Sequence, residues 1–206
     1  MKLKLLAMKF IDFAFGITVV AFSLGSLAGA FVTAFSLTFR GFMLLLINLR
    51  LIAPIRAASE SGEVTLMVLI FLNNCVPVAL SFVYALIICK VPWTPPMRTA
   101  ARNRLLTAFS LLTGGLLGFF NLGATLMLVV DVRGPTIVNG LMQTSWVHAP
   151  LEFLLVLLCV AEPLRLTRFS KTVDEILKQL RSDAKFLPLC LTGLLVSSAI
   201  EVFAHL

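Results

Sequence analysis

Charged side chains are scarce in this sequence of 206 residues, since Asp, Glu, Lys and Arg together make up 13% of it. Soluble domains carry about 25% of such residues. Apolar residues make up 59%, and the mean hydropathy is +1.01. A soluble fold of this length cannot bury so much apolar surface. The composition therefore excludes that class and predicts an integral membrane protein whose first partner is the lipid bilayer.

Short catalytic motifs are missing as well. The sequence contains no G-x-S-x-G, H-E-x-x-H or Walker A pattern. These patterns provide a nucleophilic serine, a zinc site and a phosphate-binding loop in the enzymes that carry them. Neither a conventional hydrolase nor an NTPase is indicated, and we expect no catalytic activity and no cofactor.

Cysteine is limited to four residues, Cys75, Cys89, Cys159 and Cys190. Each lies in or at the end of an apolar run, and none belongs to a C-x-x-C pair. We interpret them as small hydrophobic packing residues. They do not report the redox compartment of the protein.

Five apolar segments set the predicted architecture, an all-α polytopic transmembrane bundle that forms one integral membrane domain, 1–206. The expected spans cover residues of about 10–39, 64–89, 105–130, 149–164 and 186–206. A span needs about 20 residues, so the first is tilted or protrudes. It is also far longer than the apolar region of a signal peptide, and we interpret it as retained.

Three further segments are expected to lie at the membrane surface or to enter it partly. The interrupted apolar run 40–55 favours an amphipathic helix in the interface. Thr172 and Glu175 form a capping box, which predicts a surface helix with Ile176, Leu177 and Leu180 on its apolar edge. Residues 136–147 are moderately apolar and short, so they favour a re-entrant segment or the first part of a broken helix.

Lys and Arg are distributed unevenly between the two sides of this predicted bundle. With five spans, thirteen of the 17 fall on the side of the N-terminus, and four fall on the other, namely Arg40, Arg50, Arg56 and Arg133. Excess Lys and Arg marks cytoplasmic loops. We expect a cell-membrane protein with a cytoplasmic N-terminus and an external C-terminus. The formal charge of +7 thus indicates no nucleic-acid partner, although the basic loops can touch anionic lipid headgroups.

Small residues recur at four-residue spacing in two of the spans. Gly25 and Gly29 lie between Ala21 and Thr33 in the first, and Gly114 and Gly118 follow Ser110 in the third. Such stripes let helix backbones approach closely. They predict helix packing, either within the chain or between chains, and a homodimer or another assembly of membrane proteins is expected.

Polar residues interrupt the second span at Asn73 and Asn74, shortly before Pro77. Proline lacks an amide proton and crowds the carbonyl four residues back, here that of Asn73. The pattern favours a kinked helix with either a polar packing point or part of a water-filled cavity.

The main candidate site combines two pairs of ionisable residues spaced four apart, His148 with Glu152 and Glu201 with His205. Residues at this spacing share a helix face, and the predicted topology places both pairs near the outer side. Three interpretations stay open. They are a hydrogen-bonded network that locks helices together, a proton relay or ion path, and a site for zinc or another divalent ion.

Several motifs together resemble the stage II sporulation protein M family of multispan membrane proteins. They are Asn73-Asn74, Gly114-Gly-Leu-Leu-Gly118, Asn139-Gly140, His148-Ala-Pro-Leu-Glu152 and Ala199-Ile-Glu201-Val-Phe203. Their order and spacing fit over about residues 64–206, with a departure at Pro150, where the family commonly has glycine. The resemblance implies a membrane-embedded accessory subunit. In spore-formers the family member looks like an anchor for cell-wall hydrolases during engulfment.

Two functions from different classes follow. The first is a scaffolding subunit that organises partner proteins at the membrane, suggested by the small-residue stripes, the missing catalytic motifs and the family resemblance. The alternative is a transporter or channel whose polar intramembrane path is built from Asn73, Asn74, His148, Glu152 and Glu201.

Overall fold

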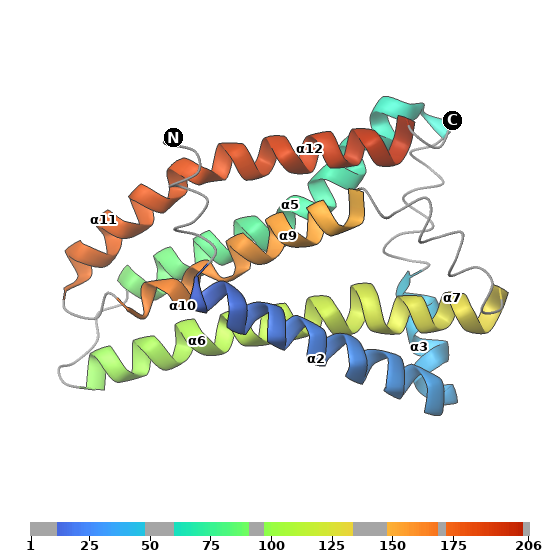
Figure 1. The fold of residues 1–206 in the computed structure, drawn as a ribbon, viewed down its shortest axis with the longest axis horizontal. Coiled ribbons are helices and arrows are strands. Elements are labelled where there is room, and N and C mark those ends of the chain that lie inside the picture. The colour runs from blue at the N-terminus through green and yellow to red at the C-terminus, as the bar shows by residue number, and fades with distance from the viewer. Residues whose placement is uncertain (1–11, 48–59, 91–96, 134–147, 169–171, 204–206) are drawn as a thin grey trace.

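A computed structural model describes residues 12–47, 60–90, 97–133, 148–168 and 172–203, and every regular element in these segments is helical (Figure 1). In chain order the elements are α2 (Phe13–Phe35), α3 (Leu37–Ile47), α5 (Glu63–Lys90), α6 (Met97–Leu117), the π-helix η2 (Gly118–Ala124), α7 (Thr125–Arg133), α9 (His148–Val160), α10 (Glu162–Leu166), α11 (Val173–Asp183), the 3-10 turn η3 (Ala184–Phe186) and α12 (Leu187–Phe203).

Four continuous helices are long and apolar enough to cross a membrane. They are Phe13–Phe35, Glu63–Lys90, Thr99–Asp131 and Asp174–Phe203. The third joins α6, η2 and α7, and the fourth joins α11, η3 and α12. The all-helical fold is thus confirmed for the described residues, and four of the five expected spans correspond to these candidate membrane helices.

The expected span 149–164 is not among these four helices. It consists of α9 and α10, which lie between α5 and α12 on one side and α2 and α6 on the other (Figure 1). Every residue from 155 to 166 is buried. The fifth expected span is therefore not confirmed, because the segment is divided into two short helices whose apolar side chains are largely covered by protein.

A serine from α6 separates α9 from α10. The Ser110 hydroxyl donates to the Val160 carbonyl oxygen (2.8 Å) and accepts from the Leu164 amide (3.0 Å). It thereby replaces the direct bond that an α-helix would form between these two groups. The next residue back, Pro163, has no amide to donate. Insertion of a side chain and a proline into the hydrogen-bond ladder explains the break at Ala161.

Two apolar clusters hold the central helices. The first joins α5, α9 and α12 and includes Val78, Leu155, Cys159, Cys190 and Leu194. The second joins α5, α6, α10 and α11 at the neighbouring end of the bundle, with Ala85, Cys89, Leu106, Leu166 and Ile176 among its members. All four cysteines are free thiols, and three of them are buried in these clusters, where they fill space as small apolar residues.

The two glycine stripes pack against each other within the chain. A Cβ atom added at Gly25 would collide with the carbonyl oxygen of Gly115, and one added at Gly118 would collide with that of Phe22. The backbones of α2 and the α6–η2 helix are therefore in direct contact, which only glycine permits here. This contact uses the small-residue surfaces that had suggested association between chains.

The π-helix changes the spacing of the glycines that face α2. A Cβ atom at Gly123 would collide with the Ser26 carbonyl oxygen, just as one at Gly118 meets that of Phe22. Because π-helical bonds join residues five apart, η2 brings Gly118 and Gly123 onto one face. The sequence shows Gly114 and Gly118 four residues apart, and the glycine surface then continues to Gly123, five residues after Gly118.

At the far end of α2 the chain bends at Ser36 into α3. The Arg40 side chain turns back to donate to the carbonyl oxygens of Thr33 (2.7 Å) and Ala34 (2.5 Å), and it pairs with Asp131 on α7 at 3.0 Å. The helix expected over 40–55 thus begins at Leu37, and residues 48–55 lie outside the described part. The proposed re-entrant segment 136–147 lies outside it as well.

The expected surface helix is part of the last long helix. The Thr172 hydroxyl accepts from the Glu175 amide at 3.2 Å, and Ile176 and Leu180 are buried, as the capping box and apolar edge predicted. However, α11 continues through η3 into α12 without a loop. The last long helix therefore starts at about residue 174, twelve residues before the apolar run begins.

Basic residues collect at one end of the bundle, where α5 ends, α6 begins and α10 and α11 lie (Figure 1). Those whose side chains the structure describes are Lys90, Arg102, Arg104, Arg165, Arg168, Lys178, Arg181 and Lys185. The opposite end holds Arg40, paired with Asp131. The charge asymmetry expected from the sequence is therefore present in three dimensions.

Candidate functional site

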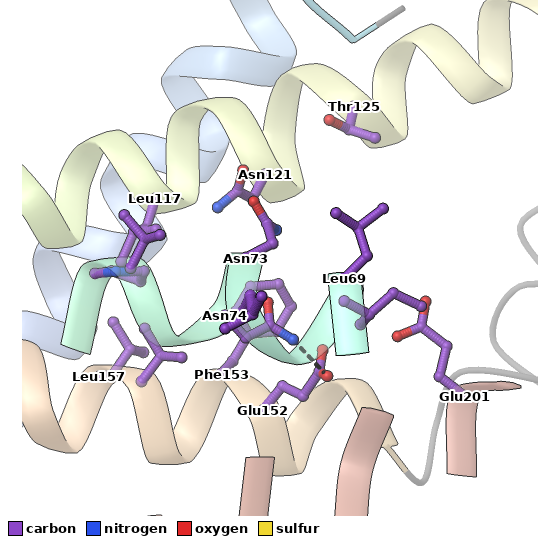
Figure 2. A pocket seen from close by; sticks show the side chains of 15 residues that line it. Leu69, Asn73, Asn74, Leu117, Asn121, Thr125, Glu152, Phe153, Leu157 and Glu201 are labelled. Atoms are coloured by element: carbon purple, nitrogen blue, oxygen red, sulfur yellow. Dashed lines mark hydrogen bonds between the residues drawn. The ribbon is translucent and has the colours of Figure 1, made fainter. Parts of the chain in front are cut away.

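A cavity of about 510 Å³ lies between α5, η2, α7, α9 and α12 (Figure 2). Its polar lining comes from Asn73 and Asn74 on α5, Asn121 and Thr125 at the η2–α7 junction, Glu152 on α9 and Glu201 on α12. Its other lining residues are Leu69, Ile70, Leu72, Val76, Pro77, Leu117, Phe153, Val156 and Leu157. The cavity is thus a largely apolar pocket with a few convergent polar groups, as small-molecule sites usually are, and it is partly open at the surface, where Leu72 and Val76 are exposed.

Glu152 and the start of α9 are held at the wall of this cavity by side chains from two other helices. Its Oε1 accepts a hydrogen bond of 2.7 Å from the Asn74 amide nitrogen. The Ser197 hydroxyl of α12 donates to the His148 carbonyl oxygen, in the first turn of α9, at 3.1 Å. These contacts tie the first turns of α9 to α5 and α12.

Glu201 reaches the same cavity from the last turn of α12. It is half-buried, and its carboxylate is near enough to Glu152 for the two to interact electrostatically. Figure 2 shows both carboxylates on the α9 and α12 side of the cavity. Acidic groups from distant parts of the chain thus line the same cavity.

The remaining members of the expected cluster lie differently. The His148 side chain is 5% exposed and is not among those that line the cavity, although its carbonyl oxygen accepts from Ser197. His205 lies outside the described residues. Among the described residues, no group of three or more His, Cys, Asp and Glu side chains could hold a metal ion. The set His148, Glu152, Glu201 and His205 is therefore not assembled as a metal site there.

Pro77 helps to position the two asparagines on α5. The helix continues from Glu63 to Lys90 through this proline, which cannot bond to the Asn73 carbonyl oxygen four residues earlier. Both asparagine side chains lie on the cavity wall one turn before the proline. The sequence left open whether Asn73 and Asn74 form a polar packing point or line a cavity. Asn74 does both, because it binds Glu152 and also lines the open space.

Asn121 and Thr125 complete the polar lining and were not among the predicted site residues. Thr125 donates from its hydroxyl to the Phe120 carbonyl oxygen, five residues back, at 2.7 Å. The bond follows the π-helical register of η2, and π-helical turns in α-helices are frequent at functional sites. Both residues appeared in the sequence only as polar positions in an apolar span, so nothing there indicated that they face α5.

A second polar cluster lies at the basic end, outside the cavity. Arg165 on α10 pairs with Glu162 at 2.5 Å and with Asp12 at 3.4 Å, and both the Arg165 and Glu162 side chains are almost fully buried. Asp12 also caps α2 by accepting from the Phe15 amide and pairs with the half-exposed Arg168 at 3.3 Å. This network connects the start of α2 to α10, and the sequence did not single it out.

Comparison with known proteins identifies no relative of this chain. No family model matches the chain, and no curated protein or solved structure does.

Proposed function

We propose that this chain is a membrane transporter that binds a small polar solute in the cavity between α5, η2, α7, α9 and α12. The observation that carries the proposal is the convergence of Asn73, Asn74, Glu152 and Glu201, from three separate helices, on one cavity of about 510 Å³ inside an apolar bundle. Ionisable residues at such depth are costly and usually mark a pathway or a binding site.

A purely structural role explains this arrangement less well. Protein interiors are close-packed, and voids larger than one water molecule are few. A polar network that only locked helices together would fill its space, as the Ser110 contacts at the α9–α10 break do. The cavity instead falls within the size range of small-molecule sites, about 300–1,000 Å³, and leaves Glu201 and Asn121 facing open volume.

The proposal includes five membrane crossings. From residue 148 to residue 166, α9 and α10 rise roughly 28 Å at 1.5 Å per residue, close to the hydrocarbon thickness of about 30 Å, and they run antiparallel to α12 in Figure 1. In this arrangement a buried fifth helix crosses the membrane inside the other four. The short helix α3 then lies at the interface.

The orientation follows from the distribution of charge. The basic end, with Arg104, Lys178 and Arg181 among its exposed residues, faces the cytoplasm of a cell-membrane protein. The N-terminus is then cytoplasmic and the C-terminus external. Glu152 and Glu201, near the opposite end, place the cavity in the outer half of the bundle.

The scaffolding function has less support from this geometry. One of its motivations was the pair of glycine stripes, and these contact each other within the chain through Gly25, Gly29 and Gly118. A scaffolding role, a homodimer and membership of the stage II sporulation protein M family stay predictions. Native mass spectrometry of the protein extracted from its own membranes tests the first two.

Water accessibility of the cavity tests the transport proposal. In a variant whose four native cysteines are replaced by alanine, Thr125→Cys places a thiol on the cavity wall. We expect a membrane-impermeant thiol reagent to label it from the outer face and, more slowly, from the cytoplasmic face in inverted vesicles. Leu112→Cys is the matched control, because Leu112 lies on the same long helix and is 64% exposed on the lipid-facing surface.

The control should stay unlabelled because thiols in lipid ionise poorly and the reagent does not enter the hydrocarbon. Labelling of Thr125→Cys from one face only indicates a binding cavity without transport, which contradicts the transport part of the proposal and keeps the solute cavity. No labelling from either face contradicts the proposal.

A further inference from the structure

We infer that the solute is an organic ammonium ion, a positively charged nitrogen carried on an apolar body. This inference rests on the proposed solute cavity and goes further by naming the chemical class. It is drawn from the charge of the lining, its apolar walls and the arrangement of its polar groups.

Among the described residues, the charged side chains that line the cavity are all acidic. They are the carboxylates of Glu152 and Glu201, and no Lys, Arg or His is among the described residues of the lining. The nearest histidine in sequence, His148, is buried one turn before Glu152 and lies outside the lining. Interactions between charges are stronger away from bulk water, so a cation gains more than a neutral or anionic solute from this site.

Elsewhere in the described residues, the cationic side chains pair with other residues or lie at the basic end of the bundle. Arg40 pairs with Asp131, and Arg165 pairs with Glu162 and Asp12 at the basic end. Neither reaches the cavity lining. Among the described residues, no cationic side chain therefore complements the two carboxylates, and in our inference the solute supplies the positive charge.

The walls favour an organic cation over a metal ion. Magnesium and calcium take six or more oxygen ligands at short distances, and no group of three or more His, Cys, Asp and Glu side chains in the described parts of the chain could hold an ion. Most lining residues are apolar, including Leu69, Phe153, Val156 and Leu157. Such walls bury the apolar body of an organic molecule, at about 25 cal/mol per Å².

The polar groups provide a distinct position for the charged nitrogen. Figure 2 places Glu152 and Glu201 along α9 and α12, and the amides of Asn73 and Asn121 along α5 and η2. The ammonium group binds between the carboxylates, and Phe153, which also lines the cavity, provides an aromatic side chain near the cation or its apolar body. The Asn121 amide on the other wall faces the cavity and can bind a polar substituent on the solute.

The test uses benzylammonium as the probe and benzyl alcohol as its neutral counterpart of similar shape, with binding measured by isothermal titration calorimetry on the detergent-solubilised full chain. Hydrogen bonds to a charged group contribute about 1.5–3 kcal/mol. We expect benzylammonium to bind at least tenfold more tightly than benzyl alcohol. Glu201→Gln should weaken benzylammonium at least tenfold and leave benzyl alcohol unchanged.

Glu63→Gln is the matched control, because Glu63 is exposed at the start of α5 and does not line the cavity. It should bind both probes as the parent does. Glu152→Gln provides a second test of the carboxylates. The glutamine keeps an oxygen that can accept from Asn74, so the packing around it is retained.

Equal affinity for the two probes, or equal loss of both in Glu201→Gln, overturns the inference and leaves the solute cavity in place. No binding of either probe by a protein whose Thr125→Cys variant is labelled from water also overturns the inference alone. Failure of that labelling from both faces removes the proposed function itself, so the two failures are distinguishable.

Discussion

The amide nitrogen of Asn74 donates to the carboxylate of Glu152 across 2.7 Å, although the two residues are 78 positions apart in the chain. The bond joins α5 to α9 at the wall of the cavity. It gives a half-buried carboxylate a partner inside an apolar bundle, and an unpaired polar group there is costly.

Loss of this bond should destabilise the protein. Asn74→Leu removes the donor and leaves the Glu152 carboxylate less well paired, which we expect to lower the free energy of unfolding by about 1–3 kcal/mol. Denaturant titration in detergent, followed by circular dichroism, measures the change. Asn121→Leu is the control, since it replaces an amide in the same cavity without touching Glu152.

A double variant extends this test. If the loss comes from the stranded carboxylate, adding Glu152→Leu to Asn74→Leu should recover part of the stability, as coupled neighbours do in a double-mutant cycle. Equal stability of Asn74→Leu and the parent protein would contradict the structural role of the bond.

Ser110 should be among the most sensitive small residues. Ser110→Ala leaves the Val160 carbonyl and the Leu164 amide, both buried, without the hydroxyl that joins them. We expect a loss of about 1–3 kcal/mol, measured by the same unfolding titration. Ser198→Ala is the control, because the Ser198 hydroxyl donates only to the Leu194 carbonyl of its own helix. Comparable losses in the two variants would argue against a bridging role for Ser110.

The buried ion pair at the basic end predicts an asymmetric response to charge removal. Arg165→Met leaves the fully buried Glu162 without its arginine, and breaking a buried pair costs about 3–5 kcal/mol. Arg168→Met removes a partly exposed partner of the same Asp12, and such pairs contribute about 0–1 kcal/mol. Thermal unfolding in detergent should rank the two variants in that order, and the reverse order would be inconsistent with the described network.

The contact between α2 and η2 predicts a difference between glycines. Gly118→Ala places a Cβ atom against the Phe22 carbonyl oxygen, whereas nothing lies within 4 Å of the corresponding position at Gly16. Overpacking costs about 1–3 kcal/mol, so Gly118→Ala should lower the unfolding temperature. Gly16→Ala should leave it unchanged or raise it, because alanine favours the helix. A neutral Gly118→Ala would mean that the two helices are farther apart.

Much of the candidate site was accessible from the sequence because two simple regularities combine there. The excess of Lys and Arg in every second loop predicted a topology in which the α9 segment begins and the α12 segment ends on the same side of the bundle. Helical spacing then set Glu152 and Glu201 on defined faces. Together these brought the acids to the same depth, where the structure has them around one cavity.

Other features depend on contacts that no local pattern reveals. The α9–α10 break comes from Ser110, which lies some 50 residues away on another helix, and η2 shifts the glycine spacing from four to five. The capping box predicted α11 as a surface helix, but no local pattern showed that it continues through η3 into α12 without a loop. Asp12, Glu162 and Arg165 carry no motif, and only the fold brings them together.

The most direct measurement is uptake of benzyltrimethylammonium, a permanently charged ion that does not diffuse through lipid as a neutral amine, into proteoliposomes containing the full chain. We predict saturable uptake by the parent protein and by Glu63→Gln, and at least a tenfold loss in Glu201→Gln. Uptake by the parent no faster than by protein-free liposomes, or undiminished uptake by Glu201→Gln, would contradict a cation-selective transport cavity at Glu152 and Glu201.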